Sequence, residues 1–76
     1  MNANRRKSIE ALISKAESLQ EEIQTILDEE QEYLDNMPEN LQGSEKYDRA
    51  ETAISNLEDA LNNMEEVEES LTQASE

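Results

Sequence analysis

The chain has 76 residues and a formal net charge of −14 at pH 7, from 20 acidic and 6 basic residues. It contains no cysteine and no histidine, which excludes disulfide bonds and the commonest protein ligand of transition metals. A chain of this length forms one small domain, and such domains often need a partner subunit for stability. Its hydrophobic fraction of 34% lies near that of disordered chains, so the case for a fold depends on the order of the residues.

Residues 8–36 are predicted to form one long amphipathic helix. Counted from Ile9, apolar residues recur at the first, fourth and fifth positions of a seven-residue repeat. The three rows are Ile9, Ala16, Ile23 and Met37; Leu12, Leu19, Ile26 and Tyr33; and Ile13, Leu27 and Leu34. A stripe of this width is typical of a helical bundle and is wider than the seam of a two-stranded coiled coil.

Residues 37–43 are predicted to be the turn between two helices. Pro38 cannot continue a helix, and it disfavours helical backbone at Met37, so the first helix should end just before them. Gly43 supplies a flexible point, and Ser44 is a residue type that caps helix N-termini.

A second helix is predicted over residues 44–74. Its apolar rows are Tyr47, Ile54 and Leu61; Ala50, Leu57, Met64 and Leu71; and Ala53, Ala60, Val67 and Ala74. Small residues on one flank of this helix can face bulky residues on a flank of the first, which allows close packing without voids. The sequence therefore predicts an all-α fold, with residues 1–76 forming a single hairpin of two antiparallel helices.

The placement of charge agrees with a hairpin. The basic N-terminal segment, residues 1–7, holds Arg5, Arg6 and Lys7, and positive charge at a helix N-terminus opposes the helix dipole. In an antiparallel hairpin these bases lie beside the acidic C-terminal end of the second helix. The acids concentrated there are Glu65, Glu66, Glu68 and Glu69.

A hairpin alone leaves part of each apolar stripe in water. Two hairpins packed as a four-helix bundle would cover both stripes, and a two-fold symmetric dimer is the commonest closed assembly. We therefore expect a homodimer. The alternative is a single hairpin that buries its stripe against a different protein.

The residue inventory argues against an enzyme and against a cofactor or metal site. Ser14 and Lys15 are adjacent, but a serine nucleophile needs a base held in a pocket, and histidine is absent. Paired carboxylates act in catalysis only when a cleft fixes their separation, and a bare hairpin offers no cleft. The acidic segment 28–35 lacks the glycine of a calcium loop and is expected to attract divalent ions only weakly.

The acidic residues are strongly segregated from the basic ones. Residues 16–36 hold eight acids and no base, and residues 50–76 hold eight more and no base. Surface helices ordinarily mix lysine with glutamate to gain pairs four residues apart, so this imbalance favours a role in binding over simple solvation. The outward positions to which we assign partner binding are Glu21, Glu22, Asp28, Glu29, Asp35, Glu51, Glu58, Asp59, Glu65 and Glu66.

Two acids, Glu30 and Glu68, interrupt the apolar rows. One interpretation is that each lies at an exposed part of the seam between the helices. The other is that Glu30 pairs with Arg49 across the hairpin and fixes the register of the two helices, as buried polar residues do in coiled coils.

The middle of the chain carries a resemblance. The segment DEEQEYLDNMPENLQGSEKYDRAE, residues 28–51, is followed by AISNLEDALNNME, residues 53–65. Its acidic helix end, its turn of the form NMPENLQGSE-Y and its alanine-rich second helix resemble a group of small proteins encoded by bacteriophages and conjugative elements. The resemblance covers about half of the chain. It implies an accessory protein of a mobile element, for which inhibition of host defence or DNA-processing enzymes is a common role, and it transfers no functional residue.

These observations predict a non-enzymatic inhibitor in the cytoplasm of a bacterial host. It would mimic the charge of DNA and occupy the basic nucleic-acid-binding site of a host protein. The alternative is a structural or adaptor hairpin that binds a partner through its apolar stripe or its turn, with the acids serving only solubility. The acidic balance disfavours direct binding of nucleic acid or of an anionic membrane.

Overall fold

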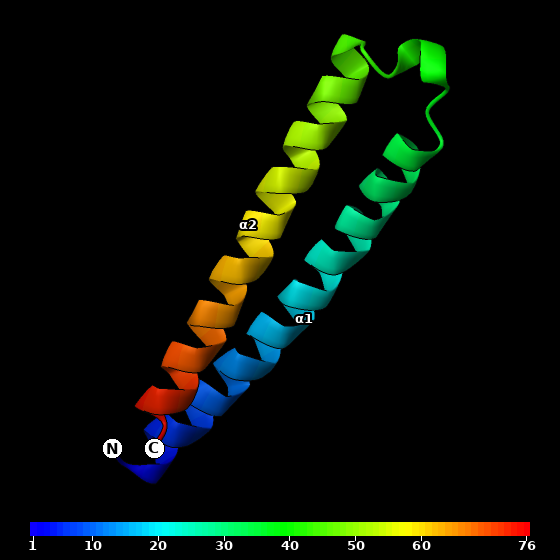
Figure 1. Cartoon of the computed structure of the whole chain (residues 1–76). Helices are drawn as coiled ribbons and strands as arrows, with labels where there is room; N and C mark the ends of the chain where they lie inside the picture. Colours follow the sequence, from blue (N-terminus) through cyan, green and yellow to red (C-terminus); the bar gives the residue numbers. More distant parts are fainter.

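The computed structural model describes all 76 residues as two long helices that run antiparallel (Figure 1). Helix α1 spans Ala3–Asp35 and helix α2 spans Glu45–Ala74, with a short 3-10 helix, η1, at Glu39–Leu41 in the turn between them. Both termini lie at one end of the molecule and the turn lies at the other (Figure 1). The hairpin measures 60 × 14 × 12 Å, and its all-α architecture is as predicted.

Helix α1 begins five residues earlier than residue 8, the predicted start. Its cap is Asn2, whose side-chain Oδ1 accepts a hydrogen bond from the backbone N–H of Arg5 at 2.8 Å. The basic segment is therefore helical from Ala3 onward, because the cap offsets the unfavourable placement of positive charge near the helix N-terminus. Arg6 also reaches α2, where its Nε donates to the backbone carbonyl of Ser75 at 3.1 Å.

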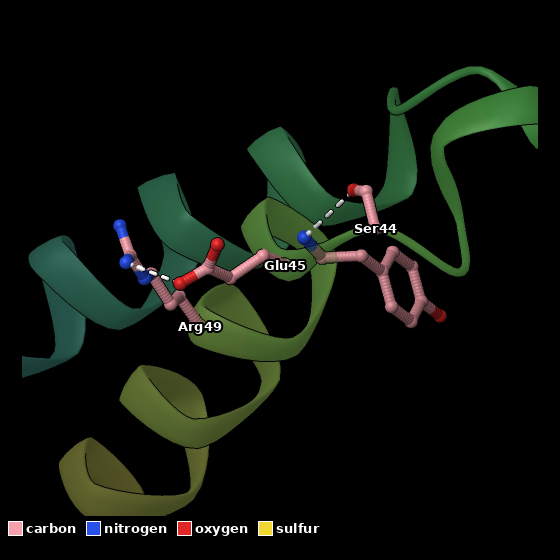
Figure 2. A network of polar contacts seen from close by, with 4 residues as sticks. Ser44, Glu45 and Arg49 are labelled. Atoms are coloured by element: carbon pink, nitrogen blue, oxygen red, sulfur yellow. Dashed lines mark hydrogen bonds and ion pairs between the residues drawn. The ribbon is translucent and has the colours of Figure 1, made fainter.

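The turn forms for the reasons expected from its proline and serine. Helix α1 ends at Asp35, and Pro38 has extended backbone at φ −59°, ψ 148°. Ser44 caps α2, because its Oγ accepts from the backbone N–H of Tyr47 at 3.3 Å (Figure 2). The same Oγ donates to the carbonyl of Leu41 at 2.5 Å. Gly43 has no positive φ and has open space where a Cβ would stand, so this turn does not require a glycine there.

The two helices meet along a narrow seam. Only four residues are buried, namely Ala16, Met37, Ala50 and Ile54. In α1 the seam uses the row of Ile9 and the row of Ile13, and the row of Leu12 is left out of it. The four members of that excluded row are large and about half exposed: Leu12 at 47%, Leu19 at 47%, Ile26 at 52% and Tyr33 at 50%.

Neither helix combines the length and the apolar character that crossing a membrane requires. The large exposed apolar residues of α1 all belong to the row of Leu12, so the exposed apolar surface of this helix is confined to one side.

The cap of α2 can be tested by replacing Ser44 with alanine. Loss of the hydrogen bond to Tyr47 N–H should lower the free energy of unfolding by about 1 kcal/mol. The measurement is chemical unfolding followed by circular dichroism at fixed protein concentration. The matched control is Ser70→Ala, at an exposed position inside α2, which should leave stability unchanged or raise it by up to about 0.5 kcal/mol. Equal effects of the two substitutions would contradict the capping role.

Candidate functional site

The seam divides the hairpin into two broad faces of different chemistry. On one side, Tyr33 of α1 lines a groove together with Ala50 and Ala53 of α2, so the excluded row of α1 lies beside the small-residue row of α2. We call these two rows the apolar face. Its residues are Leu12, Leu19, Ile26, Tyr33, Ala53, Ala60, Val67 and Ala74.

The opposite side is polar. Gln31 of α1 lines a groove with Glu51 and Glu58 of α2, which places the row of Gln31 next to the row of Glu51. We call these rows the polar face. Its residues are Glu10, Glu17, Gln24, Gln31, Glu51, Glu58, Glu65 and Thr72.

All ten carboxylates predicted to bind a partner are exposed, but the structure does not bring them together on one face. Three belong to the polar face: Glu51, Glu58 and Glu65. The others lie on the outer surfaces of the two helices, away from the seam: Glu21, Glu22, Asp28, Glu29, Asp35, Asp59 and Glu66. The predicted stripes therefore wrap around three sides of the hairpin and leave the apolar face free of them.

None of these ten carboxylates is paired with a base. The chain has one ion pair, between Arg49 and Glu45 within the first turns of α2, and both side chains are at least 75% exposed (Figure 2). Asp28 and Asp35 accept hydrogen bonds from the amides of Gln24 and Gln31 at 2.8 and 2.9 Å, which orients their carboxylates without neutralising them. Because an exposed ion pair contributes little, the hairpin retains almost all of its self-repulsion.

The two acids in the apolar rows have different surroundings. Glu30 is half-buried and lines a groove with Lys46 and Arg49, but the ion pair suggested for Glu30 and Arg49 is absent, because Arg49 pairs with Glu45 instead. Glu68 is half-buried in the seam, and the side-chain amide of Gln20, oriented with its nitrogen toward α2, donates to its carboxylate. The polar contact between the two helices at this point of the seam is therefore between Gln20 and Glu68.

Sequence reasoning did not single out Gln20. The signal was present, since Gln20 occupies the same row as Ile13, Leu27 and Leu34, where every other member is apolar. A polar residue in that row predicts a polar partner on the facing helix, and Glu68 is the acid at the matching height.

A shallow groove of about 480 Å³ lies at the turn end of the hairpin. Its apolar lining comes from Tyr33, Met37, Pro38 and Leu41, and acids at its edge include Glu29 and Glu32. No group of three or more carboxylates is arranged to hold a metal ion. The groove is therefore a candidate site for a partner segment that has an apolar side chain with a basic residue next to it.

Comparison of the chain with protein-family models, with curated proteins and with solved structures gives no match.

The unneutralised charge predicts a salt-dependent stability. Raising the salt concentration from about 20 mM to about 500 mM should screen repulsion among the carboxylates. The midpoint of thermal unfolding should rise by about 5 °C or more, which corresponds to roughly 1 kcal/mol for a domain of this size. Circular dichroism melting curves measure this. Sucrose at matched osmolality is the uncharged control, and a midpoint that is flat or falls with salt would contradict the account.

Proposed function

We propose that this chain is a non-enzymatic acidic protein of a mobile element that occupies the basic nucleic-acid-binding site of a host protein, in the bacterial cytoplasm, by presenting carboxylates where DNA presents phosphates. The observation that supports it most is the state of the ten outward carboxylates. All are exposed, none is paired with a base, and they follow two long helices along a hairpin of 60 Å.

The density of charge is suited to such a target. Fourteen net negative charges along a 60 Å axis amount to one per about 4 Å. A single strand of DNA carries one charge per about 3.4 Å of helix axis. A basic groove that binds nucleic acid would therefore meet a comparable density of negative charge on helices that are already folded, so that little backbone entropy is lost.

The context also supports the proposal. The resemblance of residues 28–65 to small proteins of bacteriophages and conjugative elements places inhibition of host enzymes among the expected roles. The same charge disfavours nucleic acid and anionic membranes as direct partners, since both are negative. We include a homodimer in the proposal because the apolar face of the hairpin is otherwise in solvent.

A second candidate function has its own support. The apolar face and the groove at the turn expose large side chains, including Leu41 at 42% and Val67 at 45%. A structural or adaptor hairpin would use these surfaces to bind its partner and would need the acids only for solubility. The two functions differ in their dependence on salt, because screening weakens charge contacts and leaves apolar contacts largely unchanged.

The test is a charge-reversed variant with Glu21, Asp28, Glu58 and Glu65 changed to lysine. Immobilised chain is used to capture proteins from a bacterial lysate at low and high salt, and duplex DNA is then used as competitor. The matched control reverses four acids that lie outside both the predicted set and the polar face: Glu39, Asp48, Glu69 and Glu76. Four reversals change the charge by eight in either variant, from −14 to −6.

The proposal predicts capture of a DNA-binding protein that duplex DNA displaces, with affinity falling steeply as salt rises. The variant in the predicted set should bind about 100-fold more weakly or not at all, while the control stays within about tenfold of the parent, and both keep their helicity. Capture that survives high salt and the charge reversal would contradict mimicry and favour the adaptor function.

A further inference from the structure

The apolar face is the part of the hairpin surface that exposes the most large hydrophobic side chains. Seven large hydrophobic residues are exposed in the whole chain, and five of them lie on this face: Leu12, Leu19, Ile26, Tyr33 and Val67. A continuous apolar strip along the length of a small protein marks an interaction site, since monomers rarely expose one.

The accessible surface agrees with a missing contact. A folded monomer of 8.7 kDa has about 4,700 Å² of accessible surface by the usual scaling with mass. The hairpin has 5658 Å², about 900 Å² more. A standard protein–protein interface buries about 800 Å² on each partner. One further contact of standard size would therefore bring the chain to the exposure of an ordinary folded protein.

We propose that a second copy of this chain covers the apolar face, with the two hairpins antiparallel, so that the turn of one lies against the terminal end of the other. The distribution of charge decides the orientation. The terminal end, residues 1–17 and 60–76, has four bases and seven acids, a net charge of −3, whereas the turn end, residues 28–51, has two bases and nine acids, a net charge of −7. A parallel dimer sets the two strongly negative turn ends side by side, and the antiparallel dimer keeps them apart.

The apolar rows fit this arrangement along their whole length. In α1 the row is centred between Leu19 and Ile26, so a two-fold axis there brings Leu12 of one copy to Tyr33 of the other. In α2 the row is centred between Ala60 and Val67, at the same height in the hairpin. One two-fold axis therefore relates both rows. The alanines of α2 allow its two copies to approach closely in the resulting four-helix bundle.

The groove at the turn also gains an occupant. Tyr33 and Leu41 line it, together with two acids, Glu29 and Glu32, and one base, Lys46. In the antiparallel dimer the N-terminal turn of the second copy lies over this groove. That turn carries Met1, which is 55% exposed, together with the bases that follow it. At both ends of the interface, Met1 would thus meet apolar side chains and the bases that follow it would lie near acids.

Dimerisation has one consequence for binding, and only this consequence rests on the proposed function. Two overlapping hairpins place 28 net negative charges along the same 60 Å, or one per about 2 Å. Duplex DNA carries one per about 1.7 Å. The dimer, rather than the single hairpin, would then approach the charge density of a duplex.

The orientation can be measured without any binding partner, so its outcome is separate from that of the proposed function. The chain has no cysteine, and Asn40→Cys places one spin label in the exposed turn without altering the apolar face. Pulsed EPR should give a label-to-label distance approaching the 60 Å length of the hairpin. Parallel hairpins would give less than about 25 Å, because packed helices lie 8–10 Å apart, and this result would overturn the orientation.

Sedimentation equilibrium tests the dimer itself. The parent should have twice the chain mass of 8.7 kDa at about 100 µM, and a monomer at that concentration would overturn the proposal. Ile26→Glu on the apolar face should weaken self-association by about 100-fold or more, because both copies carry the change. The control, Gln24→Glu on the polar face, adds the same charge and should leave the dimer intact. Equal weakening by the two substitutions would show that charge alone is responsible and would overturn the assignment of the face.

Discussion

Two helices that pack side by side cover only one side of each other, and in this chain the apolar stripe of α1 is wider than that side. The rows of Ile9 and Ile13 meet α2, and the row of Leu12 remains in solvent. The small core and the extended shape follow from this mismatch. The radius of gyration is 17.4 Å, against about 11 Å for a compact domain of this length. The hairpin alone therefore buries only part of the apolar stripe of α1.

The positions of the outward acidic residues also follow from the exposed row of Leu12. They occupy the polar face and the outer surfaces of both helices, where water and salt screen their repulsion, and they avoid the apolar face. The bases are kept to the two ends of the molecule, in residues 5–15 and at Lys46 and Arg49. The hairpin therefore has an apolar surface on one side and unrelieved negative charge on the others.

Much of the fold could be predicted from the sequence, because Pro38, Ser44 and two seven-residue repeats each act locally. Periodicity alone could not say which two of three apolar rows form the seam, since that depends on how the helices rotate against each other. The pairing of Arg49 was also wrong in the sequence-based hypothesis. A partner four residues away on the same helix, Glu45, is reached with less loss of side-chain entropy than Glu30 on the other helix. Among the outward acids only Asp28 and Asp35 have a side-chain hydrogen bond, to Gln24 and Gln31 on the same helix, so neither sequence nor fold identifies what they bind.

The central claim is that the hairpin reaches its stable form by covering the apolar face with a second copy. The most direct test is the dependence of thermal unfolding on protein concentration. If folding and dimerisation are coupled, the midpoint should rise by about 5–10 °C between about 1 µM and about 100 µM chain, because mass action favours the dimer. A midpoint that is the same across this range would contradict the account and would mean that the hairpin is stable alone.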